Sequence, residues 1–85
     1  MLMVYPLTLT PDDNDTLLVT APDIPELVTF GNDRADALRH AVGAAVAVLS
    51  ERMERGEEIP APSPVGTDTP AVVLPTLVTA KLVLY

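Results

Sequence analysis

The side chains able to do chemistry are twelve Asp and Glu carboxylates, one histidine and several hydroxyl groups, in a chain without cysteine. The missing thiols exclude disulfide bonds, thiolate metal sites and a thiol nucleophile. Three of the carboxylates, Asp12, Asp13 and Asp15, crowd one predicted turn, but this turn lacks the glycine and the terminal glutamate of a calcium-binding loop. His40 follows Asp36 by four residues, a spacing that predicts an exposed side-chain pair on a helix rather than a metal ligand.

Nucleophilic catalysis has no support in the sequence either. Ser50 and Ser63 have no histidine or other base at a recognisable spacing, and a serine nucleophile needs such a base to become reactive. We therefore expect no catalytic residues, no bound metal and no cofactor, and we do not expect the chain to be an enzyme.

Four runs rich in β-branched and apolar residues predict the strands that would position these groups. They cover residues 3–9, 16–21, 27–30 and 71–75. The first two are joined by a turn and form a hairpin. Pro6 favours an edge position for the first strand, because proline cannot donate to a ladder. A proline-rich linker at 59–70 separates the last strand from the rest.

A single long helix, from Asp33 to Arg55, is the clearest periodic element. Its expected apolar stripe contains Leu38, Val42, Ala45, Leu49 and Met53, with Ala41 and Val46 at the margins. Asp33 is placed to cap this helix, Asp36 to complete a short capping box, and Gly56 to end the last turn. If the strands on either side of the helix belong to one sheet, the connection is a right-handed crossover.

The predicted helix is long for so small a sheet. About 22 residues rise roughly 33 Å, whereas strands of five or six residues span roughly 18 Å. We therefore expect either that the helix overhangs the sheet or that its C-terminal half packs on another chain.

Composition and charge narrow the class of protein. The chain has 85 residues, of which 48% are hydrophobic, and its mean hydropathy of +0.31 excludes disorder for most of its length. That value predicts that a second copy or a partner covers part of the apolar surface. A net charge of −7 and a pI near 4.2 predict poor binding to nucleic acid and fast association with a basic partner.

No export signal is visible at the N-terminus. The longest apolar stretch, Ala41 to Leu49, is about half of the ~20 residues that a membrane-spanning helix needs. We expect a soluble, cytoplasmic protein without membrane contact. The last ten residues fit either a helix or a strand, so we divide the chain into a domain at 1–75 and a segment at 76–85 that opens a truncated C-terminal region.

Several short motifs follow one another in an order that resembles a known family. They are Tyr5-Pro6, Asp12-Asp13, Pro22-Asp23-Ile24-Pro25, Gly31-Asn32-Asp33, Ala37-Leu38 and Gly56-Glu57-Glu58-Ile59-Pro60. With this order and spacing the chain resembles the HicB-like antitoxins, and in particular the N-terminal domain of the antitoxin of a type II toxin–antitoxin module.

The resemblance implies an α+β fold, a partial and degenerate RNase-H-like β-β-β-α-β arrangement. In it, a three-stranded antiparallel meander carries one long helix, and a fourth strand lies beside the first. It also implies that the protein neutralises HicA, a small basic mRNA interferase, by direct occlusion. The full-length parent would bind DNA through a C-terminal domain, absent here, and would repress its own operon.

Two other functions stay open. An RNase-H-like sheet suggests a residual two-metal nuclease, but the predicted strands at 3–9, 16–21 and 71–75 contain no acid. The second alternative is a transcriptional regulator whose domain senses a small ligand or only oligomerises.

Two surfaces are candidates for partner binding. Acidic side chains at two loops and along the helix would complement a Lys- and Arg-rich toxin face, unless they are ordinary solubility charge. These candidates are Asp12, Asp13, Asp15, Asp23, Glu26, Asp36, Glu51 and Glu54. The apolar C-terminal run predicts the seam of a dimer or tetramer, unless it completes the sheet of the monomer. Its candidate residues are Val72, Val73, Leu74, Leu77, Leu82 and Leu84.

Overall fold

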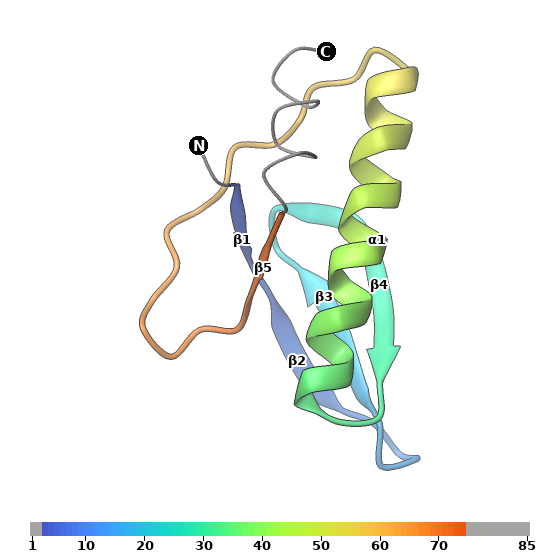
Figure 1. Cartoon of the computed structure of the whole chain (residues 1–85), viewed down its shortest axis with the longest axis vertical. Helices are drawn as coiled ribbons and strands as arrows, with labels where there is room; N and C mark the ends of the chain where they lie inside the picture. The colour runs from blue at the N-terminus through green and yellow to red at the C-terminus, as the bar shows by residue number, and fades with distance from the viewer. Residues whose placement is uncertain (1–2, 75–85) are drawn as a thin grey trace.

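The computed structural model describes residues 3–74, which contain five strands and one helix. In chain order they are β1 (Val4–Pro6), β2 (Thr8–Pro11), β3 (Leu17–Ala21), β4 (Ile24–Gly31), α1 (Arg34–Glu54) and β5 (Ala71–Val73). Strands β2, β3 and β4 form an antiparallel meander, and β5 pairs with β1 (Figure 1). The expected α+β arrangement of a meander, one long helix and a late strand beside the first is confirmed.

The first predicted strand is divided between two sheets. Strand β1 pairs with β5, whereas β2 pairs with β3, and Leu7 lies at the junction. At that junction the Leu7 N–H donates to the Pro70 carbonyl at 2.8 Å. Pro6 has a ladder partner on one side only, Ala71 of β5, in agreement with the edge position that its missing N–H favours.

The strands on either side of α1 do not belong to one sheet, so the condition for a right-handed crossover is not met. That rule holds for parallel strands of one sheet joined through a helix. Here β4 enters the helix from the three-stranded sheet, while β5 pairs antiparallel with β1 in a separate two-stranded sheet. The linker therefore returns the chain to the first strand and not to a parallel neighbour of β4.

The N-terminus of α1 is capped as the sequence predicts. Asp33 is the N-cap, and its Oδ1 accepts the backbone N–H of Asp36 at 2.8 Å. The reciprocal bond differs from an ordinary capping box, because Asp36 Oδ2 accepts from Asn32, one residue earlier, at 2.9 Å. The carboxylate at the third helical position thus fixes the approach to the helix as well as its first turn.

The C-terminus of α1 ends in a Schellman arrangement around Gly56. The Glu57 N–H donates to the Arg52 carbonyl at 2.8 Å, and the Gly56 N–H donates to the Met53 carbonyl at 3.1 Å. Gly56 has φ 74, in the left-handed region that glycine adopts without a steric penalty. The helix therefore stops at the predicted place.

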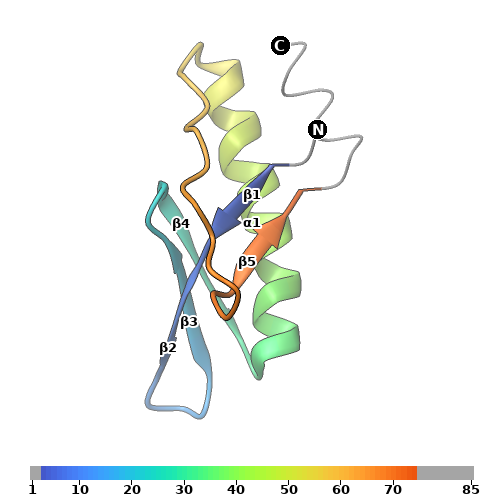
Figure 2. The same cartoon turned by 90° about the vertical axis from the view of Figure 1, so that its left-hand side faces the viewer.

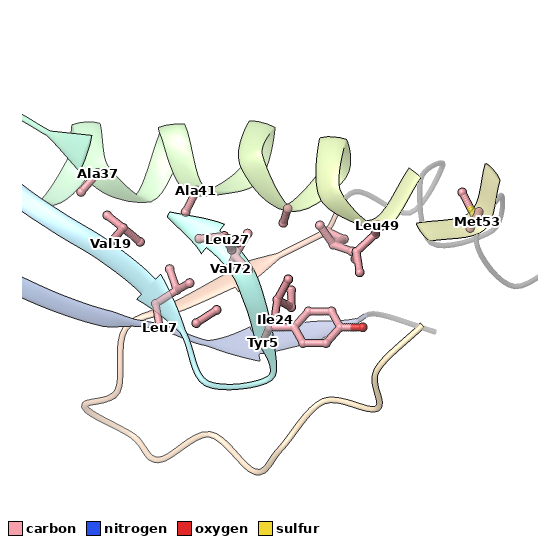
Figure 3. Close-up of a cluster of buried hydrophobic side chains, with 13 residues drawn as sticks. Tyr5, Leu7, Val19, Ile24, Leu27, Ala37, Ala41, Leu49, Met53 and Val72 are labelled. Atoms are coloured by element: carbon pink, nitrogen blue, oxygen red, sulfur yellow. The ribbon is translucent and has the colours of Figure 1, made fainter. Parts of the chain in front are cut away.

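The helix covers one face of the meander, and the other face is left open by the described elements (Figure 2). Its buried stripe is Ala37, Ala41, Ala45, Leu49 and Met53. The stripe is turned from the predicted one, since Leu38 and Val42 are only partly buried. Figure 3 shows Ala37 and Ala41 lying above Val19 and Leu27, with Leu49 above Ile24 and Tyr5.

Small residues bring helix and sheet close together at one end. A Cβ placed on Gly31 would lie 2.2 Å from the backbone nitrogen of Ala37, far inside van der Waals contact, so this position admits only glycine. At the other end α1 overhangs the sheet, as one of the two expectations had it (Figure 1). Its last apolar residues, Leu49 and Met53, are nevertheless buried within the chain, and Ile59 of the linker packs against the same core.

Candidate partner-binding surface

The tip of the β2–β3 hairpin holds three carboxylates in water. Asp12, Asp13 and Asp15 are all exposed. The Asp12 N–H donates to the Thr16 carbonyl at 2.9 Å, Asp12 Oδ1 accepts the Asp13 N–H at 2.8 Å, and Asp15 has φ 58. Within residues 3–74, no Arg or His side chain forms an ion pair with any of the three. The turn thus presents its charges without neutralising them.

Asp23, between β3 and β4, fastens the linker to the sheet. Its Oδ1 accepts the Ser63 hydroxyl at 2.6 Å and its Oδ2 accepts the Ser63 N–H at 2.7 Å. These two donors hold the pKa of Asp23 below its ordinary value. Nearby, the Tyr5 hydroxyl donates to the Pro60 carbonyl at 2.7 Å, and burial, together with the charge of Asp23, raises the pKa of Tyr5. Both oxygens of the Asp23 carboxylate are therefore hydrogen-bonded within the chain.

Glu26 ties β4 to the end of the helix. Arg52 Nε donates to Glu26 Oε2 at 2.6 Å, and Arg52 Nη2 donates to Glu26 Oε1. The same guanidinium donates through Nη1 to the Glu58 carbonyl at 3.3 Å. The two-pronged bond with Arg52 lowers the pKa of Glu26 to about 2 and raises that of Arg52. The negative charge of Glu26 is thus largely compensated where it stands.

Asp36 is also engaged. Besides the Asn32 N–H it accepts a bond from Arg39 Nη2 at 2.5 Å, and these donors lower its pKa. His40 Nε2 lies 3.6 Å from Asp36 Oδ1, which confirms the predicted pair, and His40 Nδ1 lies 2.5 Å from the Phe30 carbonyl oxygen. This cluster joins the first turn of α1 to the end of β4.

Glu51 and Glu54 lie on the last turn of α1 and stay accessible. Glu51 Oε1 is 3.3 Å from Arg55 Nη2, with both side chains more than half exposed, and this is the pair predicted from their spacing of four. Glu54 is exposed, and the described part of the chain gives it no ion-pair partner. The helix end and the hairpin tip lie at opposite ends of the molecule (Figures 1 and 2).

The eight predicted carboxylates therefore fall into two classes. Asp23, Glu26 and Asp36 are bound to groups of the same chain. The accessible class consists of Asp12, Asp13, Asp15, Glu51 and Glu54. The fastening roles of Arg52, Ser63 and Tyr5 were not predicted, because each side chain bonds to a residue far away along the chain.

Two kinds of feature are absent from residues 3–74. Among the residues that the structure describes, no three His, Asp or Glu side chains gather as a ligand set would. Residues 3–74 also contain no helix that is both long enough and apolar enough to cross a bilayer.

The candidate oligomerisation residues have different surroundings. Val72 and Leu74 are 1% and 0% exposed and belong to the core of the chain itself. Val73, between them, is 49% exposed. Leu77, Leu82 and Leu84, like the whole segment 76–85, lie outside the described residues. Among the candidate seam residues that the structure describes, Val73 alone has an exposed side chain, and the predicted seam stays a prediction.

Comparison with known proteins places the chain in a family. Residues 4–83 match the family model described as the HicB-like antitoxin of bacterial toxin–antitoxin systems. The chain belongs to the HicB-like antitoxin family. Over 82 residues it is 39% identical to antitoxin HicB 1 of Photorhabdus laumondii and 35% identical to antitoxin HicB of Escherichia coli K12. Both alignments cover 96% of this chain, but only 52% and 59% of those relatives.

A solved structure has the same fold. The crystal structure of the N-terminal domain of Burkholderia pseudomallei antitoxin HicB superposes with a TM-score of 0.67 at 24% identity, over 87% of this chain and 98% of that one. The chain thus spans about half the length of the curated HicB relatives and has the fold of a HicB N-terminal domain.

Proposed function

We propose that this HicB-like chain neutralises a basic, HicA-like mRNA interferase by covering the surface on which the toxin would hold RNA. The observation that carries the proposal is the hairpin tip, where Asp12, Asp13 and Asp15 keep their charges exposed and uncompensated within the described chain. An RNA-binding surface is rich in Lys and Arg, and carboxylates that take the place of phosphates complement it.

The division of the carboxylates sharpens this proposal. Asp23, Glu26 and Asp36 hold the fold together and serve a partner only indirectly. The accessible acids lie at two ends of a molecule whose longest extent is 40 Å, so a small toxin contacts one end more closely than the other. We assign the first contact to the hairpin tip, because no Arg or His side chain among residues 3–74 pairs with its acids, whereas Glu51 pairs with Arg55.

The experiment measures the rate at which the chain captures such a toxin. The variant D12N/D13N/D15N removes the hairpin charges, and the control E57Q/E58Q/D68N removes the same number of exposed charges elsewhere. At low ionic strength we expect the hairpin variant to associate roughly tenfold more slowly and the control no more than about twofold more slowly. An RNA cleavage assay with each complex then reports occlusion.

Three results contradict the proposal. Equal association rates for the wild type and the hairpin variant would remove the hairpin from the encounter. Equal losses in both variants would mean that only total charge matters. A complex that forms at the normal rate but still cleaves RNA would separate capture from occlusion and would overturn the occlusion mechanism.

The remaining parts of the function concern the longer parent protein. We propose that it acts in the cytoplasm and represses its own operon through a separate DNA-binding region. The charge of −7 supports assigning DNA contact to another region, because a chain with this charge is repelled by phosphates.

A further inference from the structure

The side of the β2–β3–β4 sheet that points away from α1 presents two cross-strand rows of side chains. The register aligns Thr8 with Thr20 and Val28 in one row, and Thr10 with Leu18 and Phe30 in the other. Directly opposed residues of neighbouring strands point to the same side of a sheet. The row between them contains Val19, which is buried under the helix. The two rows therefore form the outer surface of the meander, here called the open face.

Three large apolar side chains lie next to one another on the open face. Val28 is 57% exposed and Phe30 is 49% exposed, and Leu18 lies opposite Phe30 on the neighbouring strand. In Figure 2 neither α1 nor another labelled strand covers this side of the sheet. Adjacent exposed apolar side chains indicate a contact site, whereas scattered ones are ordinary.

The acids of the hairpin tip begin where this apolar surface ends. Beyond the row of Phe30, the ladder of β2 and β3 closes with the Asp12 N–H donating to the Thr16 carbonyl at 2.9 Å. Asp13 and Asp15 follow in the turn, and no Arg or His side chain among residues 3–74 pairs with these acids. The open face thus has an acidic border at one end.

This combination restricts the class of partner that fits. Nucleic acid is disfavoured, because its phosphates would meet the acidic border. An uncharged apolar partner would cover Val28 and Phe30 but would leave the acids of the border without a counter-charge. A partner that carries cations beside apolar or aromatic groups complements both parts of the surface.

A protein surface that holds single-stranded RNA has this composition. Its Lys and Arg side chains bind the phosphates, and its aromatic side chains stack on the bases. Unstacked bases of single-stranded RNA are recognised largely through such stacking. Carboxylates of the hairpin tip can take the place of phosphates, and the flat apolar surface around Phe30 can take the place of bases.

We propose that the open face packs on the base-stacking groups of the toxin, beside the Lys and Arg side chains that the hairpin tip contacts. This inference rests on the proposed function, since it takes a basic RNA-cleaving toxin as the partner. Charges at the border of an interface act mainly on the rate of encounter, and apolar anchors at its centre act on dissociation. The hairpin tip therefore governs how fast the toxin is captured, and the open face governs how long it stays bound.

The test measures association and dissociation rates separately, with a purified HicA-like toxin immobilised and the 85-residue chain in solution. The variant that combines Val28→Thr with Phe30→Thr removes apolar surface from the open face and keeps residues that suit a strand. The matched control, Val73→Thr, makes the same change at a valine of similar exposure on β5. Far-UV circular dichroism verifies the fold of each variant, and sedimentation analysis compares their assembly states.

We expect the open-face variant to release the toxin roughly tenfold faster than the wild type. Its association rate should change by less than about twofold, because the charges that guide the encounter are intact. Val73→Thr should change neither rate by more than about twofold. The variant D12N/D13N/D15N should show the opposite pattern, with slower association. Added salt should slow association of the wild type and of the open-face variant alike, because ions screen charge but not apolar contact.

Several outcomes overturn the inference while the proposed function stands. One is a toxin that dissociates from the open-face variant as slowly as from the wild type. Another is an equal effect of Val28→Thr and Val73→Thr. A third is an altered assembly state of the open-face variant, which would make a second copy the occupant of this face. A wild-type chain that does not bind the toxin at all overturns the proposed function and this inference together.

Discussion

The two faces of the meander are built from the same strands by different rules. On the covered face the contacts of β3 and β4 with α1 select for size: Gly31, Ala37 and Ala41 allow backbones to approach closely, and Val19 fills the space between them. On the other face, which no described element covers, no neighbouring element limits side-chain size, and Val28 and Phe30 are exposed. The paired positions of that face carry no charge: they are Thr8, Thr10, Leu18, Thr20, Val28 and Phe30. A strand can thus satisfy strict packing on one side and remain available to a partner on the other.

The largest effect that we expect on the covered face comes from Gly31→Val. Its Cβ would lie 2.2 Å from the nitrogen and 2.4 Å from the Cα of Ala37, and neither backbone atom can move without lifting the first turn of α1 from the sheet. The free energy of unfolding should fall by about 4 kcal/mol, more than the roughly 1–3 kcal/mol of ordinary overpacking, because the clash is with backbone atoms. Urea denaturation followed by circular dichroism measures the change.

Gly43→Ala is the matched control for this substitution. A Cβ on Gly43 meets no atom within 4 Å, and alanine favours a helix over glycine by roughly 1 kcal/mol. This variant should therefore be more stable than the wild type. If both glycine substitutions destabilised the chain alike, close approach of helix and sheet would not be the reason for Gly31.

Ala41→Leu tests the same rule in the middle of the helix. Ala41 is 0% exposed, so the added carbon atoms must displace the sheet, and we expect a loss of about 2 kcal/mol. The control, Ala47→Leu, makes the same change at an exposed position of α1, where it should alter the free energy of unfolding by less than about 0.5 kcal/mol. Similar values for the two variants would contradict a size-selected face.

The sequence predicts the elements of this fold better than it predicts the contacts between them. The ends of α1 are set by local chemistry at Asp33 and Gly56, and both were predicted. The stripe was misplaced because hydropathy gives weight to Leu38 and Val42, whereas close packing on β4 selects the alanines at 37 and 41. The division of the first strand at Leu7 depends on β5, more than sixty residues later, and no local signal records such a pairing.

The sequence predicted which residues carry charge at the candidate site, but not which of these carboxylates are accessible to a partner. The pairs at a spacing of four, Glu51 with Arg55 and Asp36 with His40, follow from helix geometry and are present. The bond between Glu26 and Arg52 joins residues 26 positions apart, and only the folded chain brings them together. Which carboxylates are compensated is therefore a tertiary property.

The bond between Glu26 and Arg52 fastens β4 to α1 with a pH-dependent contact. Arg52 lowers the pKa of Glu26 from 4.5 to about 2 in the folded chain. A depressed pKa means that the ionised carboxylate stabilises the folded state fully above pH 4.5, and that this contribution disappears as the pH falls toward 2. Glu26→Gln should thus flatten, without abolishing, the loss of stability over that window, because Asp23 and Asp36 also have lowered pKa values.

Thermal unfolding of the wild type and Glu26→Gln, measured at intervals between pH 2 and 6, gives this difference directly. Glu54→Gln is the matched control, since it removes an exposed carboxylate from the same end of α1 that has no ion-pair partner among residues 3–74. It should keep the acid profile of the wild type. The effect of Glu26→Gln should be the smallest of those considered, because an ion pair that water reaches contributes little to stability. If the two variants had the same profile, Arg52 would not be holding Glu26 in its ionised form, and the covered side of β4 would depend on packing alone.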